Sequence, residues 1–109
     1  MPNFSKSAVV LVRYPFSDLS NSKVRPAVIV GTQEESKDVF IVPLTSKLSS
    51  LLSGEFILSD WRNSGLNVPT SVKRGLYTID RGLILRNLGR LSPDDANQLD
   101  GSLRRWLEI

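Results

Sequence analysis

The sequence predicts a mainly β protein: a small curled antiparallel sheet or barrel of five to six short strands, followed by one α-helix at residues 92–107. Short segments rich in Val, Ile and aromatic residues alternate with turn-forming residues along most of the chain, which is typical of sequentially connected strands. Only the last segment combines capping residues with helical periodicity. The 109 residues match the size of one domain, so we expect a single domain covering residues 1–109.

The first three predicted strands contain most of the apolar residues. Residues 9–14 are β-branched and aromatic, and a turn-rich stretch follows at 15–22. Residues 26–31 are mostly Ala, Val and Ile after an initial proline. This composition predicts a strand that is buried on both faces and begins at Pro26. We expect residues 38–44 to form the next strand.

The middle of the chain predicts shorter elements. Residues 55–58 alternate polar and apolar side chains, as a half-buried strand does. Residues 59–65 predict a short capped helical turn that ends at its final glycine. Residues 71–79 and 83–91 predict two further strands, separated by a turn at 80–82.

The C-terminal segment is the predicted helix. Ser92 suits the N-cap and Pro93 the first helical position, and Asp95 lies where it can complete a capping box with Ser92. Gly101 lies inside this helix at a cost of about 1 kcal/mol relative to alanine, which suggests close packing or a kink there. Apolar residues recur at helical spacing, so one face should pack on the sheet. These residues are Ala96, Leu99, Leu103, Trp106 and Leu107.

The composition excludes several kinds of chemistry. The chain has no cysteine and no histidine, so it lacks disulfides, thiolates and the residue that most often binds zinc or transfers protons near neutral pH. We expect no metal site and no cofactor. No apolar run approaches the roughly 20 residues that span a bilayer, and the first residues lack a signal-peptide core, so we expect a cytoplasmic protein with no membrane partner. The net charge of +3 permits a polyanionic partner without requiring one.

Two predicted strand ends carry polar residues that suit the binding of one anion. Arg25 enters the strand at 26–31, and Thr45 and Ser46 leave the strand at 38–44. RNA supplies its own nucleophile, the 2′-hydroxyl, so a protein can cleave it by stabilising the crowded phosphorus centre. The forked guanidinium of arginine matches two phosphate oxygens, and a preorganised donor of this kind typically contributes about 10²–10³ in rate. Together with the hydroxyl donors, Arg25 therefore predicts an oxyanion site.

Each of these residues also has a simpler interpretation. An arginine before a strand is often solvated or ion-paired, and a Thr-Ser pair after a strand often bonds the backbone of a turn. Basic residues on later strands can line a phosphate track or form a solvated face, and aromatic side chains can stack on bases or fill the core. The basic residues concerned are Lys73, Arg74, Arg86 and Arg90, and the aromatic ones are Trp61 and Tyr77.

Four parts of the chain form a recognisable pattern in sequence order. They are VVLVRYPFSDL at 9–19, KVRPAVIV at 23–30, VPLTS at 42–46, and YTID at 77–80 with GRLSP at 89–93. This pattern resembles the PemK/MazF family of toxin endoribonucleases over nearly the whole chain. The Arg-Pro-Ala and Pro-Leu-Thr-Ser motifs are moderately specific singly and strong together at this spacing.

The resemblance implies an SH3-like barrel, a homodimer, and metal-independent cleavage of single-stranded RNA that leaves a 2′,3′-cyclic phosphate and a 5′-hydroxyl. It also implies that the protein is the toxin of a type II toxin-antitoxin system. The disordered tail of its cognate antitoxin would fill the RNA groove. The toxin would contact DNA only indirectly, through the antitoxin. The family's strand-entry arginine falls on Arg25 and its strand-end threonine on Thr45. The loop at 16–22 matches the loop that gates the site in such toxins. The further predicted RNA-binding residues are Lys23, Ser46, Lys47 and Arg74.

The chain departs from the family pattern in two places. Ser7 and Ala8 replace the Gly-Asp pair that commonly precedes the first strand. The segment at 71–79 is shorter than usual: Arg74 matches the arginine of that pattern, but the aspartate that some members use as a base has no counterpart. The sequence therefore assigns no general base.

The sequence is also consistent with two other functions. One is a CcdB-like protein that poisons DNA gyrase without catalysis, for which the C-terminal Trp106, Leu107 and Ile109 would matter. The other is a non-catalytic nucleic-acid-binding barrel, which the missing base favours.

Overall fold

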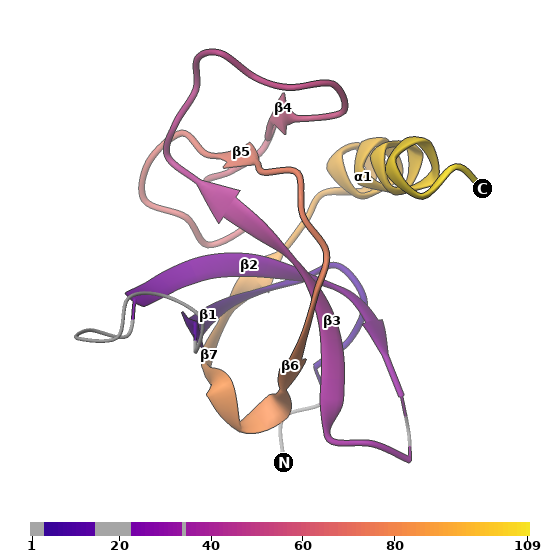
Figure 1. The fold of residues 1–109 in the computed structure, drawn as a ribbon. Coiled ribbons are helices and arrows are strands. Elements are labelled where there is room, and N and C mark those ends of the chain that lie inside the picture. The colour runs from indigo at the N-terminus through magenta and orange to yellow at the C-terminus, as the bar shows by residue number, and fades with distance from the viewer. Residues whose placement is uncertain (1–3, 15–22, 34) are drawn as a thin grey trace.

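The computed structural model describes residues 4–14, 23–33 and 35–109, and these contain seven strands, one 3₁₀ turn and one α-helix. The elements are β1 (Ala8–Tyr14), β2 (Lys23–Thr32), β3 (Asp38–Thr45), β4 (Phe56–Ile57), β5 (Ser71–Val72), β6 (Tyr77–Asp80), η1 (Arg81–Leu83), β7 (Ile84–Arg90) and α1 (Pro93–Leu107). The prediction of a mainly β protein with one C-terminal helix is confirmed (Figure 1). The predicted loop at 16–22 lies outside the described residues.

The strands form one curled antiparallel sheet in the order β4-β5-β3-β2-β1-β7, and β6 pairs with β3 as well. Within the described residues the end strands β4 and β7 do not pair with each other, so the sheet does not close into a barrel. The expected count of five to six strands is wrong because the strand predicted at 71–79 is split. β5 pairs with the end of β3 and β6 with its beginning, while residues 73–76 leave the ladder between them.

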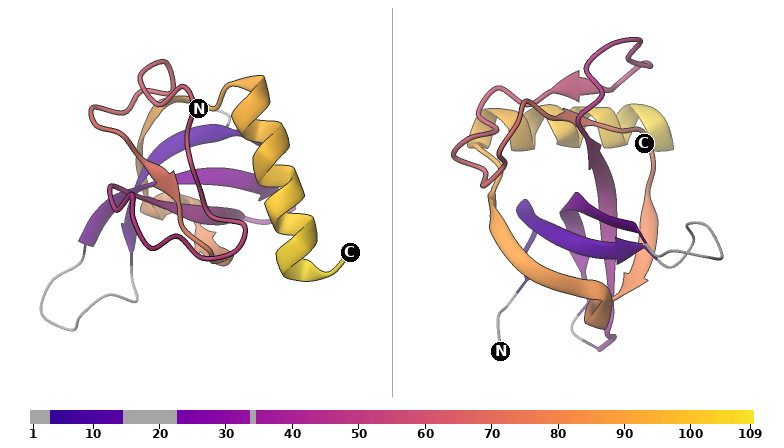
Figure 2. Two further views of the ribbon diagram at one scale, coloured as in Figure 1. Left: turned by 90° about the horizontal axis from the view of Figure 1, so that it is seen from above. Right: turned by 90° about the vertical axis from the view of Figure 1, so that its left-hand side faces the viewer.

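Two apolar cores lie on opposite faces of the central strands. Along β1, Val9 belongs to the core that α1 covers, whereas Val10 and Val12 belong to the core inside the curl of the sheet. β2 alternates in the same way, with Val28 in the first core and Ile29 in the second. The prediction of a strand buried on both faces is thus confirmed. Figure 2 shows α1 on one side of the curled sheet and η1 on the opposite side.

Pro26 lies inside β2 rather than at its start. The strand begins at Lys23, and Pro26 pairs with Leu11 of β1. Pairing between β2 and β3 begins only at Ala27, so this end of β2 has a neighbour on one side alone. A missing N–H is tolerated there because it removes no bond of the β2–β3 ladder.

The start of α1 is fastened to the turn at residues 59–65. Ser92 caps the helix, and its Oγ accepts a hydrogen bond from the backbone N of Asp95 at 3.2 Å. The Asp95 carboxylate does not complete a capping box. It is buried and accepts hydrogen bonds from the N and Oγ of Ser59, both at 2.9 Å, and from the N of Asp60 at 3.2 Å. The predicted helical turn is present as hydrogen-bonded turns that close at Gly65, which has φ 88°.

The end of α1 packs on the loop before β4. Trp106 Nε1 donates to the carbonyl of Ser53 at 2.9 Å, and Ser102 Oγ donates to that of Gly54 at 2.7 Å. Leu107 was expected on the packed face but is exposed, and it lines an open groove together with Leu103 and Trp106. Gly101 is exposed too, and a Cβ there would meet no atom within 4 Å, so the expectation of close packing is wrong. In the described part of the chain, no helix is long and apolar enough to cross a lipid bilayer.

Candidate functional site

Arg25 and Thr45 come together where the β2–β3 ladder ends. Ala27 and Pro43 are the last paired residues at this end of the ladder. Arg25 lies two residues before Ala27 on β2, and Thr45 lies two residues after Pro43 on β3. Because the strands are antiparallel, the continued register places Arg25 across from Thr45. Arg25 is exposed and Thr45 half-buried, so both side chains are accessible to a ligand.

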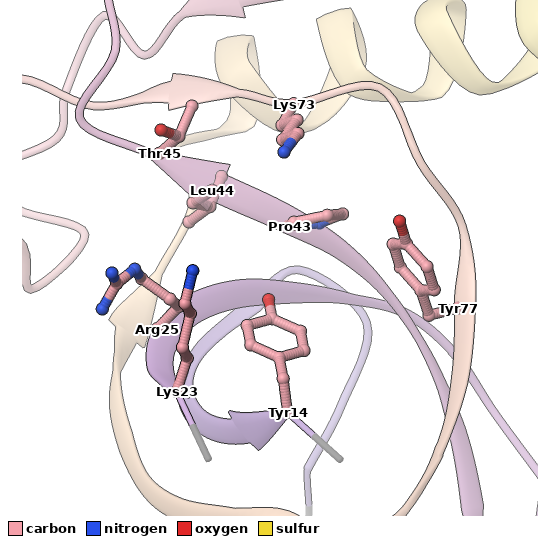
Figure 3. A pocket seen from close by; sticks show the side chains of 8 residues that line it. All are labelled: Tyr14, Lys23, Arg25, Pro43, Leu44, Thr45, Lys73 and Tyr77. Atoms are coloured by element: carbon pink, nitrogen blue, oxygen red, sulfur yellow. The ribbon is translucent and has the colours of Figure 1, made fainter. Parts of the chain in front are cut away.

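The first of two cavities at this position, the tyrosine cavity, has a volume of about 250 Å³. Its lining includes Tyr14, Lys23, Lys73 and Tyr77 in addition to Arg25 and Thr45, with Pro43 and Leu44 between them. Figure 3 shows the Arg25 guanidinium and the Thr45 hydroxyl at one end of this cavity and Tyr77 at the other. The cavity therefore combines positive charge, hydroxyl groups and two aromatic rings.

The second cavity, the Arg86 cavity, has a volume of about 570 Å³ and shares Arg25 and Thr45 with the first. Ser46, Asn67 and Arg86 add further polar groups to its lining. Its apolar lining includes Leu11, Val68 and Leu88. Arg25 and Thr45 thus lie between two cavities, each of which can hold part of the same extended ligand.

The charge of the site is positive on both sides of Arg25. Lys23 and Lys73 line the tyrosine cavity and Arg86 lines the other, whereas no carboxylate is found among the described lining residues of either cavity. Burial of the Tyr14 hydroxyl, reinforced by the neighbouring Tyr77 and opposed by the charge of Arg25, raises the pKa of Tyr14 to about 12. Tyr14 is therefore a neutral hydrogen-bond donor near neutral pH.

The hydrogen bonds of Arg25 and Thr45 leave donors available. Arg25 Nη1 donates to the carbonyl of Val24 at 3.0 Å, which uses one of the five guanidinium N–H groups. The Thr45 Oγ1 accepts a hydrogen bond from the backbone N of Lys47 at 3.2 Å. Since Oγ1 is an acceptor in that bond, its own hydrogen remains to be donated to an anion.

The structure separates the four predicted RNA-binding residues, Lys23, Ser46, Lys47 and Arg74, into four places. Lys23 lines the tyrosine cavity and Ser46 the Arg86 cavity. The Lys47 side chain is exposed and lines neither cavity.

Arg74 lies in a different groove from Arg25. This groove has a volume of about 340 Å³ and runs between Leu76 and the Leu103 side of α1. The backbone N of Arg74 donates to Glu55 Oε2 at 2.7 Å, which fixes the chain where it leaves the β3 ladder. As a result Lys73, and not Arg74, lines the tyrosine cavity.

Other residues of the two cavities were not in the predicted site. The sequence offers Tyr77 and Arg86 as candidates, but it is equally consistent with a core position for Tyr77 and a solvated one for Arg86. The sequence does not indicate Tyr14 or Asn67 as site residues, because a single sequence does not show which strand end or loop lies next to Arg25. Arg90, the other candidate of β7, is held by the N-terminal segment: its Nη1 donates to the carbonyl of Lys6 at 2.7 Å.

Fold and site together define a small mainly β protein with a cationic cleft at the open end of its β2–β3 ladder. More specifically, the chain belongs to the PemK-like, MazF-like toxin family of type II toxin-antitoxin systems, whose sequence model matches residues 6–107. No curated protein matches the chain.

Several solved structures share the fold. The Mycobacterium tuberculosis toxin MazF-mt6 is 22% identical, with 94% of this chain and 97% of that chain covered and a TM-score of 0.73. A MazE-MazF structure from Deinococcus radiodurans is 15% identical, with 95% of each chain covered and a TM-score of 0.76. An endoribonuclease in complex with its cognate antitoxin from a Mycobacterial species is 16% identical, covers 95% and 94% of the two chains, and has a TM-score of 0.73.

Proposed function

We propose that this toxin is an endoribonuclease that cleaves single-stranded RNA and leaves a 2′,3′-cyclic phosphate and a 5′-hydroxyl. The observation that carries the proposal is the position of Arg25 and Thr45 between two cavities whose other charged lining residues are all basic. Family membership supports the same activity, since structural relatives are described as endoribonucleases.

In this mechanism the 2′-oxygen attacks the adjacent phosphorus and the bond from phosphorus to the 5′-oxygen breaks. Arg25 donates to two non-bridging oxygens and Thr45 donates its hydroxyl hydrogen, so both groups stabilise the extra negative charge of the transition state. The described lining of the cavities holds neither a carboxylate nor an imidazole, so we assign the 2′-proton to solvent. The leaving 5′-oxygen takes a proton from solvent in return.

The residues around this pair bind the RNA without taking part in bond cleavage. Lys23 and Lys73 bind phosphates next to the cleaved one, and the half-exposed ring of Tyr77 stacks on a base. Ser46 adds a donor beside Thr45, and Lys47 supplies charge from outside the cavity. Arg74 is a candidate contact only for RNA that extends beyond the two cavities.

Two protein partners follow from the same reasoning. The solved relatives include toxins in complex with their antitoxins. We infer that an acidic antitoxin segment occupies the cationic cavities of this chain, so that antitoxin and RNA compete. We also infer a homodimer, on the family resemblance; its mass in solution, measured by light scattering, tests this inference.

The gyrase-poison alternative loses its aromatic residue, whereas Leu107 and Ile109 are exposed. Trp106, the aromatic residue on which that hypothesis depended, packs against Gly54 and bonds Ser53. A supercoiling assay with and without the last four residues of the chain distinguishes this alternative from cleavage.

Cleavage of a long single-stranded RNA in the presence of EDTA tests the proposal. We expect wild type to cleave and Arg25→Ala to be slower by about 10²–10³-fold, because one preorganised donor is lost. Arg25→Lys keeps the charge but loses the fork, so it should recover only part of the rate. Arg104→Ala removes an exposed charge from α1 and is the matched control. The proposal fails if wild type does not cleave, or if Arg25→Ala cleaves as fast as Arg104→Ala.

A further inference from the structure

We propose that the Arg86 cavity is a nucleotide subsite beside the cleaved phosphate, in which Arg86 binds the next phosphate and Asn67 reads the edge of the base. This inference rests on the proposed function, because it takes Arg25 and Thr45 as the place of the cleaved phosphate. It names the residues that would give this chain its own sequence preference.

The Arg86 cavity adjoins the proposed place of the cleaved phosphate. Arg25 and Thr45 belong to its lining as well as to that of the tyrosine cavity. A phosphate held by this pair therefore has one cavity on each side. An RNA strand that passes through the site must place the nucleotide on one side of the cleaved bond in the Arg86 cavity. Its volume of about 570 Å³ lies in the range of pockets that bind small organic ligands.

The charge of the Arg86 cavity favours an anionic ligand. Arg86 is exposed on β7, and among the described residues no carboxylate lies within ion-pair distance of it or of Arg25. Two guanidinium groups that share one cavity without a carboxylate favour an anionic ligand. Since a phosphate on Arg25 is the cleaved one, Arg86 is placed to bind its neighbour in the strand.

The loop that carries Asn67 is held in place on both sides of this residue. The neighbouring residue Leu66 is buried, and its backbone N donates a hydrogen bond to the carbonyl of Trp61 at 3.1 Å. On the other side, Thr70 Oγ1 donates to the carbonyl of Val68 at 2.8 Å, and the Thr70 carbonyl accepts from Leu58 N at 2.9 Å. The loop is thus held at both ends while Asn67 stays exposed.

The same loop is also fastened to β7, the strand that carries Arg86. A Cβ on Gly65 would lie 1.9 Å from the carbonyl oxygen of Leu88, so only glycine permits this approach. Figure 2 shows the segment between β4 and β5 beside the end of β7 that leads into α1. The loop that carries Asn67 is therefore anchored through its backbone to the strand that carries Arg86. An amide presents a donor and an acceptor together, which is the combination that distinguishes base edges in single-stranded RNA.

RNA binding gives the first test. The probe is a short fluorescein-labelled single-stranded RNA, 2′-O-methylated so that it cannot be cleaved, titrated at several salt concentrations. We expect Arg86→Ala to bind about 5- to 50-fold more weakly than wild type. Its plot of log affinity against log salt should be shallower by roughly 0.7, because one phosphate contact is lost. Arg104→Ala, which removes the same charge outside both cavities, should change neither quantity.

Sequence preference gives the second test. Wild type, Asn67→Ala and Asn67→Asp are incubated with an RNA library of random sequence, and the ends of the products are sequenced. We expect both variants to lose the base preference at one position next to the cleaved bond and to keep the preference on the other side. Thermal unfolding confirms that each variant is folded.

The two proposals fail in different ways. If wild type does not cleave, or cleaves independently of Arg25, the endoribonuclease proposal fails. A different result overturns the subsite proposal: cleavage depends on Arg25, but the Arg86 and Asn67 variants behave like Arg104→Ala. They would then match it in RNA affinity, salt dependence and base preference. In that case the charge of the Arg86 cavity serves a protein partner.

Discussion

Arg25 and Thr45 face each other two residues beyond Ala27 and Pro43, the last paired residues at that end of the β2–β3 ladder. The Arg25 side chain is exposed and that of Thr45 is half-buried, and both residues are carried on paired strands. Arg25 pairs with Val12 of β1, and Thr45 pairs with Ser71 of β5. Strand pairing therefore fixes the backbone of both residues and leaves their donors free to meet a phosphate, which is the preorganisation that transition-state stabilisation requires.

The Thr45 hydroxyl should act as a donor and not merely as a filler of space. We expect Thr45→Val, which keeps the shape, to slow RNA cleavage by about 10–100-fold, because one hydrogen bond to the developing charge is lost. Thr45→Ser keeps the hydroxyl and should cleave at nearly the wild-type rate. Initial rates on one RNA substrate decide between them, and equal rates for the valine and serine variants would contradict the assigned role.

Asp95 should be a major contributor to stability. Its buried carboxylate accepts three hydrogen bonds from Ser59 and Asp60, so Asp95→Ala leaves three partly buried donors without partners. We expect the free energy of unfolding to fall by about 2–4 kcal/mol. Asp94→Ala removes an exposed carboxylate from the same helical turn and should lose about 0.3–1 kcal/mol through the helix dipole alone. Urea denaturation compares the two, and equal losses would show that the buried hydrogen bonds contribute little.

Gly65 should tolerate no side chain. Its φ of 88° is unfavourable for other residues, and a Cβ would overlap the Leu88 carbonyl. We expect Gly65→Ala to reduce the free energy of unfolding by about 2–4 kcal/mol, since strain and a backbone clash add together. A denaturation midpoint close to that of wild type would mean that the loop at 65–70 is not held against β7.

Gly101 should show the opposite sign for the same substitution. It lies in α1 with no atom near the position of a Cβ, so Gly101→Ala gains helix propensity without a clash. We expect the free energy of unfolding to rise by about 0.5–1 kcal/mol. The thermal midpoint measures the change, and a decrease would show that the exposed side of this helix is covered in solution.

Glu55 should make stability depend on pH in the acid range. Partial burial of its carboxyl opposes ionisation, but hydrogen bonds from the N of Arg74 and Leu52, with the charges of Arg74 and Lys47, outweigh it and lower the pKa. A carboxyl with a lowered pKa stabilises the fold above the unfolded-state pKa of about 4.3, and that contribution is lost as the pH falls through the folded-state value.

The matched substitution for this prediction is Glu55→Gln. At pH 6 we expect it to be less stable than wild type by about 0.2–1 kcal/mol, a small value because the site is partly exposed. At pH 3 the difference should be smaller, because the fraction of Glu55 that is protonated in the folded state rises as the pH falls. Urea denaturation at the two pH values measures both differences, and a gap that is the same at each pH would contradict the lowered pKa.

The local signals in the sequence were sufficient for most of the fold. Runs of β-branched and other apolar residues predicted β1 to β3, and Ser92 with Pro93 predicted the start of α1. The split of the strand expected at 71–79 was not predictable, because the break at 73–76 depends on where β3 ends and on Glu55 bonding the Arg74 backbone. Propensity describes neighbours along the chain, whereas this break is imposed by a residue 19 positions away.

For the site, the sequence by itself determined the chemical types: an arginine at one strand end, two hydroxyls at another, and a chain without histidine or cysteine to do other chemistry. Only the tertiary structure decided which residues surround that pair. The curl of the sheet brings Tyr14 and Tyr77 to one side of Arg25, and the glycine contact of the loop at 65–70 with β7 brings Asn67 to the other. Strand register and the close approach of two backbone segments determine these neighbours. Both are properties of the packed chain, so the identity of each single residue does not predict them.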